Sequence, residues 1–158
     1  MPDELERKFI IRHLPEKLSM YHHHDIEQGY FLKNPGMPFL EERLRIKDGT
    51  FSFTSKIGEG SSRNELERTV SYRYFEVMWP LTEGRRIEKI RYDIPLENGL
   101  VAELDIFCGK LMGHVTAEVE FKTADEMDSF VPPSWFGEEV TKDPRYQNYN
   151  LSVDGLPK

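Results

Sequence analysis

The chain carries like-charged residues in pairs whose members are separated by one residue. The acidic pairs are Glu4/Glu6, Glu65/Glu67, Glu103/Asp105 and Glu118/Glu120. The basic pairs are Arg43/Arg45 and Lys89/Arg91, accompanied by Lys8 and Lys56. Both members of such a pair share one face of an extended chain, because successive side chains point to opposite faces. Carboxylates bind hard divalent cations, and guanidinium and ammonium groups bind phosphate oxygens. If these faces meet, they predict a site for a metal-bound phosphate compound.

The segments that carry the pairs alternate charged and apolar residues, which is typical of β-strands. The first strand runs from Glu4 to Ile11. Asp48-Gly49 and Asn98-Gly99 are hairpin signals and favour antiparallel neighbours. A sheet with one face in water would also explain any single strand. The segregation of the pairs by sign instead favours a sheet that curls into a barrel with a polar lumen and outward apolar faces.

Three amphipathic segments are predicted to cover those outward faces. Ser71–Leu81 carries Phe75 and Trp79 at helical spacing, Thr123–Glu126 is a capping box, and Asp143-Pro144 begins a short C-terminal helix. Between the strands, a helical turn is predicted for Leu14–Leu18 and a glycine- and serine-rich mobile loop for Ile57–Asn64. The three histidines His22–His24 are interpreted as a solvated loop in preference to a metal site.

Composition limits the class of protein. A chain of 158 residues fits a single domain, residues 1–158. A formal net charge of -7 argues against a nucleic-acid partner, whose phosphates require a basic surface. The one cysteine, Cys108, suits a reducing compartment, and no stretch approaches the roughly 20 apolar residues that span a bilayer. We therefore expect a cytoplasmic protein with no membrane partner. The outward apolar faces could also support a homodimer.

The ordered set of motifs resembles the CYTH superfamily, the triphosphate tunnel metalloenzymes. The resemblance covers nearly the whole chain, and it is greatest to the short bacterial inorganic tripolyphosphatases. The motifs that carry it are Glu4-x-Glu6-x-Lys8, Glu27-Gln28-Gly29-Tyr30, Arg43-x-Arg45, Thr82-Glu83-Gly84-Arg85-Arg86, Lys89-x-Arg91-Tyr92, Glu103-Leu104-Asp105, Glu118-x-Glu120 and Trp135–Thr141. One departure is Thr54-Ser55-Lys56, where relatives often have an apolar middle residue.

The resemblance implies an α+β, mainly β fold: a closed eight-stranded antiparallel barrel that hydrolyses inorganic tripolyphosphate to pyrophosphate and phosphate with two Mg²⁺ or Mn²⁺ ions. By position, it makes Glu4, Glu6, Glu118 and Glu120 metal ligands. Glu103 and Asp105 are then supporting or second-metal ligands, and Glu65 and Glu67 are further candidates. The implied triphosphate clamp consists of Lys8, Arg43, Arg45, Lys56 and Arg91. The catalytic role, orienting the attacking water or assisting the leaving group, falls to Lys89.

Two kinds of alternative stay open from the sequence. The first is other triphosphate chemistry of the same superfamily, either thiamine triphosphatase or class IV adenylyl cyclase. Such a substrate needs a pocket for its organic group, which Tyr30, Trp135 and Phe136 could line. The second is a non-catalytic module that binds polyphosphate or a nucleotide. The acidic pairs argue against that module, because a pure anion binder could use basic residues alone.

Overall fold

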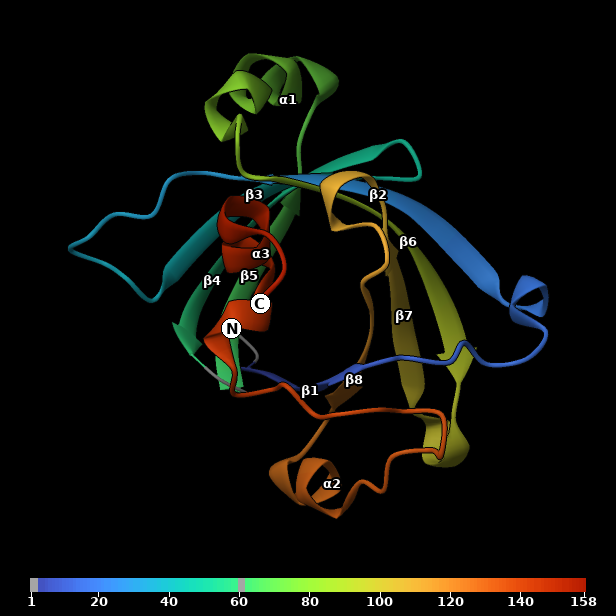
Figure 1. Cartoon of the computed structure of the whole chain (residues 1–158). Coiled ribbons are helices and arrows are strands. Elements are labelled where there is room, and N and C mark those ends of the chain that lie inside the picture. The colour runs from blue at the N-terminus through green and yellow to red at the C-terminus, as the bar shows by residue number, and fades with distance from the viewer. Residues whose placement is uncertain (1–2, 60–61) are drawn as a thin grey trace.

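The protein is a closed, eight-stranded antiparallel β-barrel, as seen in a computed structural model that describes residues 3–59 and 62–158 (Figure 1). Around the barrel the strands follow the order β1-β5-β4-β3-β2-β6-β7-β8, and β8 pairs again with β1. The strands are β1 Asp3–Ile10, β2 His22–Tyr30, β3 Leu40–Lys47, β4 Thr50–Glu59, β5 Ser62–Thr69, β6 Arg86–Pro95, β7 Val101–Phe107 and β8 Val115–Phe121. The predicted fold class is confirmed.

Strand register brings the charged residues of β1, β7 and β8 together in the lumen. Glu6 lies opposite Glu120, and Lys8 lies opposite Glu118. Glu118 in turn lies opposite Glu103. The residues that alternate with them on β7 and β8 face outwards and belong to a buried apolar cluster, which consists of Ile11, Ile94, Ala102, Leu104, Ala117, Val119 and Phe121. The two-residue period of the strands therefore separates a polar interior from an apolar exterior.

Two hairpins were predicted from dipeptides, and both form. The turn between β3 and β4 places Asp48 at φ 50° and Gly49 at φ 79°. The turn between β6 and β7 places Asn98 at φ 62° and Gly99 at φ 75°, inside a short 3₁₀ segment, Glu97–Gly99. Asp, Asn and Gly tolerate this left-handed region, and it gives the chain reversal the twist that antiparallel strands require.

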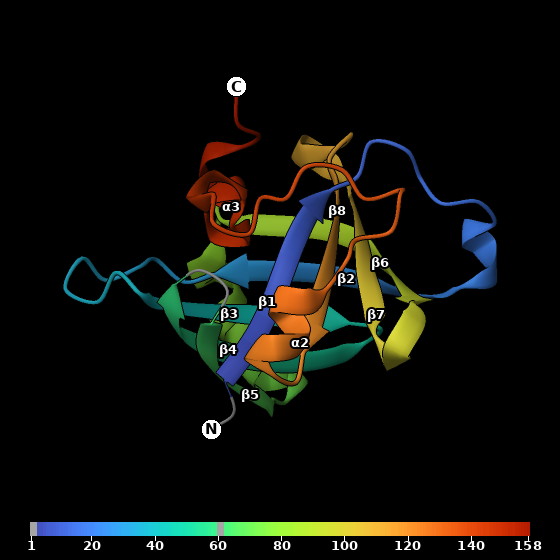
Figure 2. The same cartoon turned by 90° about the horizontal axis from the view of Figure 1, so that it is seen from below.

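The first two of the three predicted helical segments cover outward apolar faces, as predicted, whereas the C-terminal one packs at an end of the barrel. Helix α1, Tyr72–Met78, packs Phe75 against Phe51 of β4 with ring centroids 4.9 Å apart. Helix α2, Ala124–Ser129, is capped by Thr123, whose hydroxyl accepts from the Glu126 N–H. It lies over β1 and β8 (Figure 2). Phe130, which ends α2, packs on Phe121.

The chain beyond α2 crosses back along β1. The Gly137 N–H donates to the Ile10 carbonyl, and the Val140 N–H donates to the Lys8 carbonyl, each at 2.8 Å. Only glycine fits at position 137, because a Cβ there would lie 2.5 Å from the Ile10 carbonyl oxygen. This crossing segment adds a partner to β1 where β5 no longer pairs with it.

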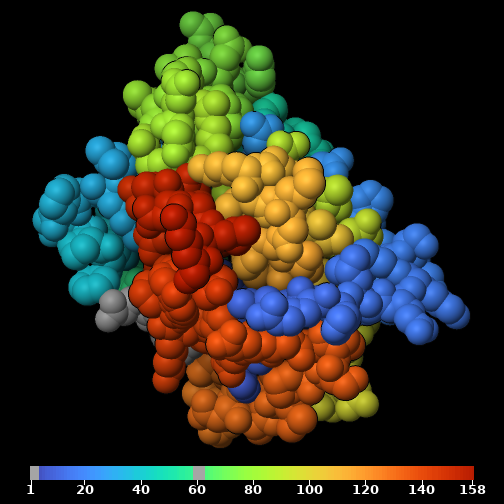
Figure 3. Space-filling view, in the orientation of Figure 1, coloured from blue at the N-terminus to red at the C-terminus, as the bar shows by residue number. Residues whose placement is uncertain are grey.

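The last helix closes one end of the barrel. Helix α3, Asn148–Asp154, follows a 3₁₀ turn, Pro144–Tyr146, and lies beside the Gly109–Leu111 turn on the face seen in Figure 3. Tyr149 and Leu151 of α3 belong to an apolar cluster with lumen-facing residues of three strands. That cluster contains Tyr30, Ile87, Phe107, Leu111, Tyr149 and Leu151.

Three local predictions were wrong. His22–His24 begin strand β2 and are not a loop, because they pair with Asp93, Tyr92 and Arg91 of β6. The segment Ile57–Asn64 is largely strand, since β4 extends to Glu59 and β5 begins at Ser62; Gly60 and Ser61 lie outside the described residues. The helical turn expected at Leu14–Leu18 comes later, at Leu18–Met20. The described residues include no helix that is long and apolar enough to cross a membrane.

Candidate active site

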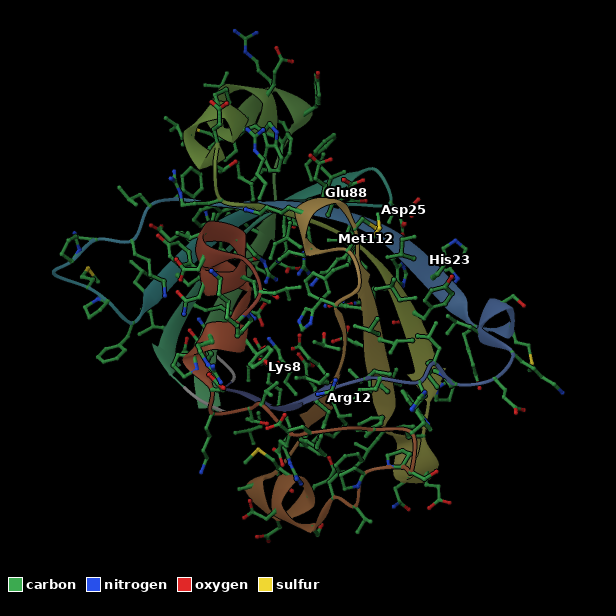
Figure 4. All side chains as sticks on the ribbon, in the orientation of Figure 1. Lys8, Arg12, His23, Asp25, Glu88 and Met112 are labelled. Carbon is green, nitrogen blue, oxygen red and sulfur yellow. The ribbon has the colours of Figure 1, made fainter. Side chains whose placement is uncertain are left out.

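A cavity of about 500 Å³ occupies the lumen and gathers most of the predicted site residues. Figure 4 shows the barrel interior filled with nitrogen- and oxygen-bearing side chains, whereas Asp25 and Glu88 lie outside the ring of strands. The predicted residues that line the cavity are Glu4, Glu6, Lys8, Arg43, Arg45, Lys56, Glu65, Glu67, Arg91, Glu103, Glu118 and Glu120. Lys89 and Asp105 are not brought to the cavity.

One part of the cavity wall is suited to a divalent cation. Glu4, Glu6 and Glu120 each offer a carboxylate oxygen, and these oxygens lie within 4.8 Å of one another. Burial and the negative charge of Glu118 raise the pKa of Glu6 well above its ordinary value. Without a cation these carboxylates crowd together at an electrostatic cost, which a bound divalent ion would remove. An all-carboxylate ligand set fits a hard cation such as Mg²⁺ or Mn²⁺.

The opposite wall carries the basic residues. Arg43 and Arg45 are buried on β3, with 5% and 8% of their surface exposed. Arg45 donates from Nε and Nη2 to the Gln28 Oε1 at 3.1 and 2.8 Å, which fixes the plane of its guanidinium. The Lys56 ammonium donates to Glu4 at 3.1 Å, so the basic wall meets the carboxylate cluster directly.

Lys8 connects the strands to the C-terminal segment. Its ammonium donates to the Tyr146 carbonyl at 3.1 Å and lies 3.8 Å from Glu118. Figure 4 labels Lys8 on β1, at the lower edge of the enclosed space. Lys8 therefore touches both the lumen carboxylates and the segment that covers them.

Beneath the cavity, Asp105 pairs with two cations. It accepts from the Lys89 ammonium at 2.7 Å and from Arg91 Nε and Nη2 at 2.7 and 2.9 Å. The side chains of Lys89 and Asp105 are both 0% exposed. Burial lowers the pKa of Lys89 to about 7, although Asp105 acts against this shift. Arg91 also donates to Glu103 at 3.1 Å, so the carboxylates of Asp105 and Glu103 together hold Arg91 at the cavity floor.

Sequence reasoning gave no site role to several residues of the site, among them Gln28, Glu41 and Arg63, and it considered Tyr30 only for an organic-group pocket. Tyr30, Glu41 and Arg63 line the cavity, and Gln28 donates to the Tyr30 hydroxyl at 2.6 Å while holding Arg45. Extending the same alternation by one pair would have found Glu41 before Arg43 and Arg63 before Glu65. Arg63 was missed because it fell within the predicted loop.

His24 bridges three strands at the rim of the cavity. Its Nδ1 contacts Asp48 in the β3–β4 turn, and its Nε2 lies 2.7 Å from Asp93 on β6. A carboxylate only accepts, so both contacts are satisfied together only when both ring nitrogens carry protons. Burial lowers the pKa of His24, but the hydrogen bonds to Asp48 and Asp93 outweigh it and raise the pKa above its ordinary value.

A His24→Asn variant is expected to lose stability in a pH-dependent way. Because the folded-state pKa of His24 is raised, its stabilising effect is complete below the unfolded pKa and is lost as pH rises through the folded pKa. Urea unfolding at about pH 5.5 and about pH 9 measures this. The wild type should exceed the variant at the lower pH and approach it at the higher.

The matched control is His23→Asn, since His23 is exposed on the other face of the same strand and packs on Tyr92. It should show no such dependence. An equal deficit of His24→Asn at both pH values would contradict the charged bridge.

A closed barrel whose lumen joins a carboxylate cluster to guanidinium and ammonium groups is suited to a polyanion that carries a divalent cation. An inorganic triphosphatase of Nitrosomonas europaea is 43% identical over 150 residues, covering 95% of this chain and 97% of the relative. An inorganic triphosphatase of Acetivibrio thermocellus is 36% identical over 153 residues, covering 96% of this chain and 94% of the relative. The chain belongs to the inorganic triphosphatase family.

A solved structure agrees with this assignment. The crystal structure of an inorganic triphosphatase aligns with a TM-score of 0.71 and 40% identity, covering 98% of this chain and 100% of the other. No family model matches the chain. The two relatives and this structure confirm the resemblance that was stated from the motifs.

Proposed function

We propose that the protein hydrolyses inorganic tripolyphosphate to pyrophosphate and phosphate, using Mg²⁺ or Mn²⁺. The observation that carries this proposal is a contact between the basic residues and the carboxylate cluster of one cavity: Lys56 donates to Glu4. A linear triphosphate needs positively charged side chains along its length, and the metal ions bound to it need carboxylates at one point. Both requirements are met within the same 500 Å³.

The carboxylates Glu4, Glu6 and Glu120 would hold the cation, with Glu118 beside them on β8. Glu103 is a further candidate ligand, and Glu65 and Glu67 line the same cavity. When bound, the metal neutralises phosphate oxygens and assists attack on the terminal phosphorus by water. Two ions are expected, since three complete acidic pairs and Glu103 line the cavity.

The basic residues bind and orient the substrate. Arg43, Arg45 and Arg91 present guanidinium groups, which match phosphate oxygens two at a time, and Lys8 and Lys56 add ammonium groups. Phosphoryl transfer depends mainly on such positioning and charge stabilisation. Lys89 acts through Asp105, whose carboxylate it shares with Arg91, because its ammonium lies off the cavity.

Tripolyphosphate is favoured over thiamine triphosphate and ATP by the lining of the cavity. Trp135 and Phe136, which were candidates for an organic-group pocket, are not among its lining residues. They pack on the outer apolar cluster instead. Tyr30 does line the cavity, but it is fully buried and held by Gln28, so it offers no open aromatic surface. The homodimer stays a prediction.

A phosphate-release panel tests the proposed function. The wild-type protein is incubated with tripolyphosphate, thiamine triphosphate, ATP or pyrophosphate, each with Mg²⁺, with Mn²⁺ and with a chelator. Phosphate release from tripolyphosphate should exceed release from the two organic triphosphates, and the chelator should abolish it. Tight tripolyphosphate binding without release would instead support a non-catalytic binding module. Faster release from an organic triphosphate would support the other superfamily activities.

A further inference from the structure

One carboxylate of the cavity lies among cations and away from the carboxylate cluster. Glu41, on β3, lines the cavity on the same face as Arg43 and is 4% exposed. Burial raises its pKa, but the positive charges of Arg63, Lys56 and Arg43 hold the pKa below its ordinary value. A carboxylate surrounded by positive charge is a poor metal ligand, because a divalent cation there would be repelled.

Arg63, the cation that lies nearest Glu41, is incompletely satisfied. Its Nη2 is 3.5 Å from Glu41 Oε1, which is longer than a good charge-assisted hydrogen bond. Its Nε is buried and has no hydrogen-bond partner among the described residues, and the same holds for Arg43 Nε. Two guanidinium groups that line one cavity thus each retain a buried, unused Nε donor, which is costly unless a ligand supplies acceptors.

A phosphate group would satisfy these donors better than the carboxylate does. It carries more oxygens, and guanidinium groups bind them in pairs. We propose that Arg63 binds a phosphate group of the substrate, and that Glu41 is the counter-ion which this phosphate group displaces. The proposal rests on the proposed function in one respect, that the anion is an inorganic phosphate chain.

Displacement has a measurable consequence. Binding must break the Glu41–Arg63 pair and must leave a negative carboxylate close to a negative ligand, so Glu41 weakens anion binding. The competing explanation is that Glu41 holds Arg63 in its binding position. The two explanations predict opposite signs: removal of the Glu41 charge tightens binding in the first and weakens it in the second.

The experiment measures the affinity of the full chain for inorganic tripolyphosphate by titration calorimetry. A metal chelator is present, so that no turnover occurs. Glu41→Gln should bind about tenfold more tightly than wild type, and Arg63→Gln about tenfold more weakly. The control is Glu42→Gln, an equal change of charge on the opposite face of β3, and it should stay within about twofold. Weaker binding by Glu41→Gln, or unchanged binding by Arg63→Gln, would overturn the proposal.

An additional variant separates binding from folding. Arg63→Lys keeps the charge but loses the paired donors, so it should bind more weakly than wild type and more tightly than Arg63→Gln. Urea unfolding of each variant shows whether the barrel is intact. The phosphate-release panel judges the proposed function separately. Absence of release with tighter binding by Glu41→Gln would refute the activity alone, whereas release with unchanged binding by Arg63→Gln would refute this inference alone.

Discussion

A Glu6→Gln variant is expected to lose metal-dependent phosphate release by roughly 100-fold or more. Glu6 supplies one of the three carboxylate oxygens that lie within 4.8 Å of one another, and an amide is a much poorer ligand for a hard cation. Steady-state release from tripolyphosphate, measured over a titration of Mg²⁺ and of Mn²⁺, gives both the rate and the apparent metal affinity.

The same variant should not be less stable than wild type in chelator. The pKa of Glu6 is raised because it is buried near Glu118, so its charge is unfavourable in the metal-free barrel. Thermal unfolding in chelator therefore separates loss of metal from loss of fold. Glu88→Gln is the matched control, since Glu88 is exposed on the outer face of β6. Turnover of Glu6→Gln within a few-fold of wild type would remove Glu6 from the metal site.

The second large effect concerns stability. Asp105→Asn should reduce the free energy of unfolding by about 3–5 kcal/mol, because it leaves two buried cations without their shared negative partner. Urea unfolding measures it. Glu103→Gln serves as the control: Glu103 bonds Arg91 through one nitrogen and its side chain is 30% exposed, so about 1 kcal/mol or less is expected. A loss below about 1 kcal/mol in Asp105→Asn would show that Lys89 and Arg91 do not depend on it.

The alternation of charge along the strands predicted which faces would meet in the lumen. Glu4, Glu6 and Glu120 come together because a strand has only two faces, and the face that carries the charged pair is the one that points into the lumen. The hairpins were predictable for a similar reason: Asp48-Gly49 and Asn98-Gly99 accept a backbone geometry that few other residues tolerate.

Depth within the lumen was not predictable in the same way. Lys89 and Arg91 share a face, yet Arg91 lines the cavity while Lys89 is fully buried beneath it. The difference depends on strand tilt and on the apolar cluster built around α3, neither of which leaves a local signal in the sequence. His22–His24 were missed as strand residues because histidine has no marked strand preference, and their pairing with β6 is a long-range contact.

The closed barrel also restricts how the chain can change in length. Lys8 faces Glu118, while its neighbours Arg7 and Phe9 lie on the outer face, where Arg7 pairs with Glu139 and Phe9 packs on Phe136. One inserted or deleted residue in β1 would exchange these faces over part of the strand, moving charges outwards and apolar groups into the lumen. Related chains are therefore expected to differ in length at the connections between strands. Within a strand, tolerated insertions and deletions should come in twos, or be absorbed by a bulge.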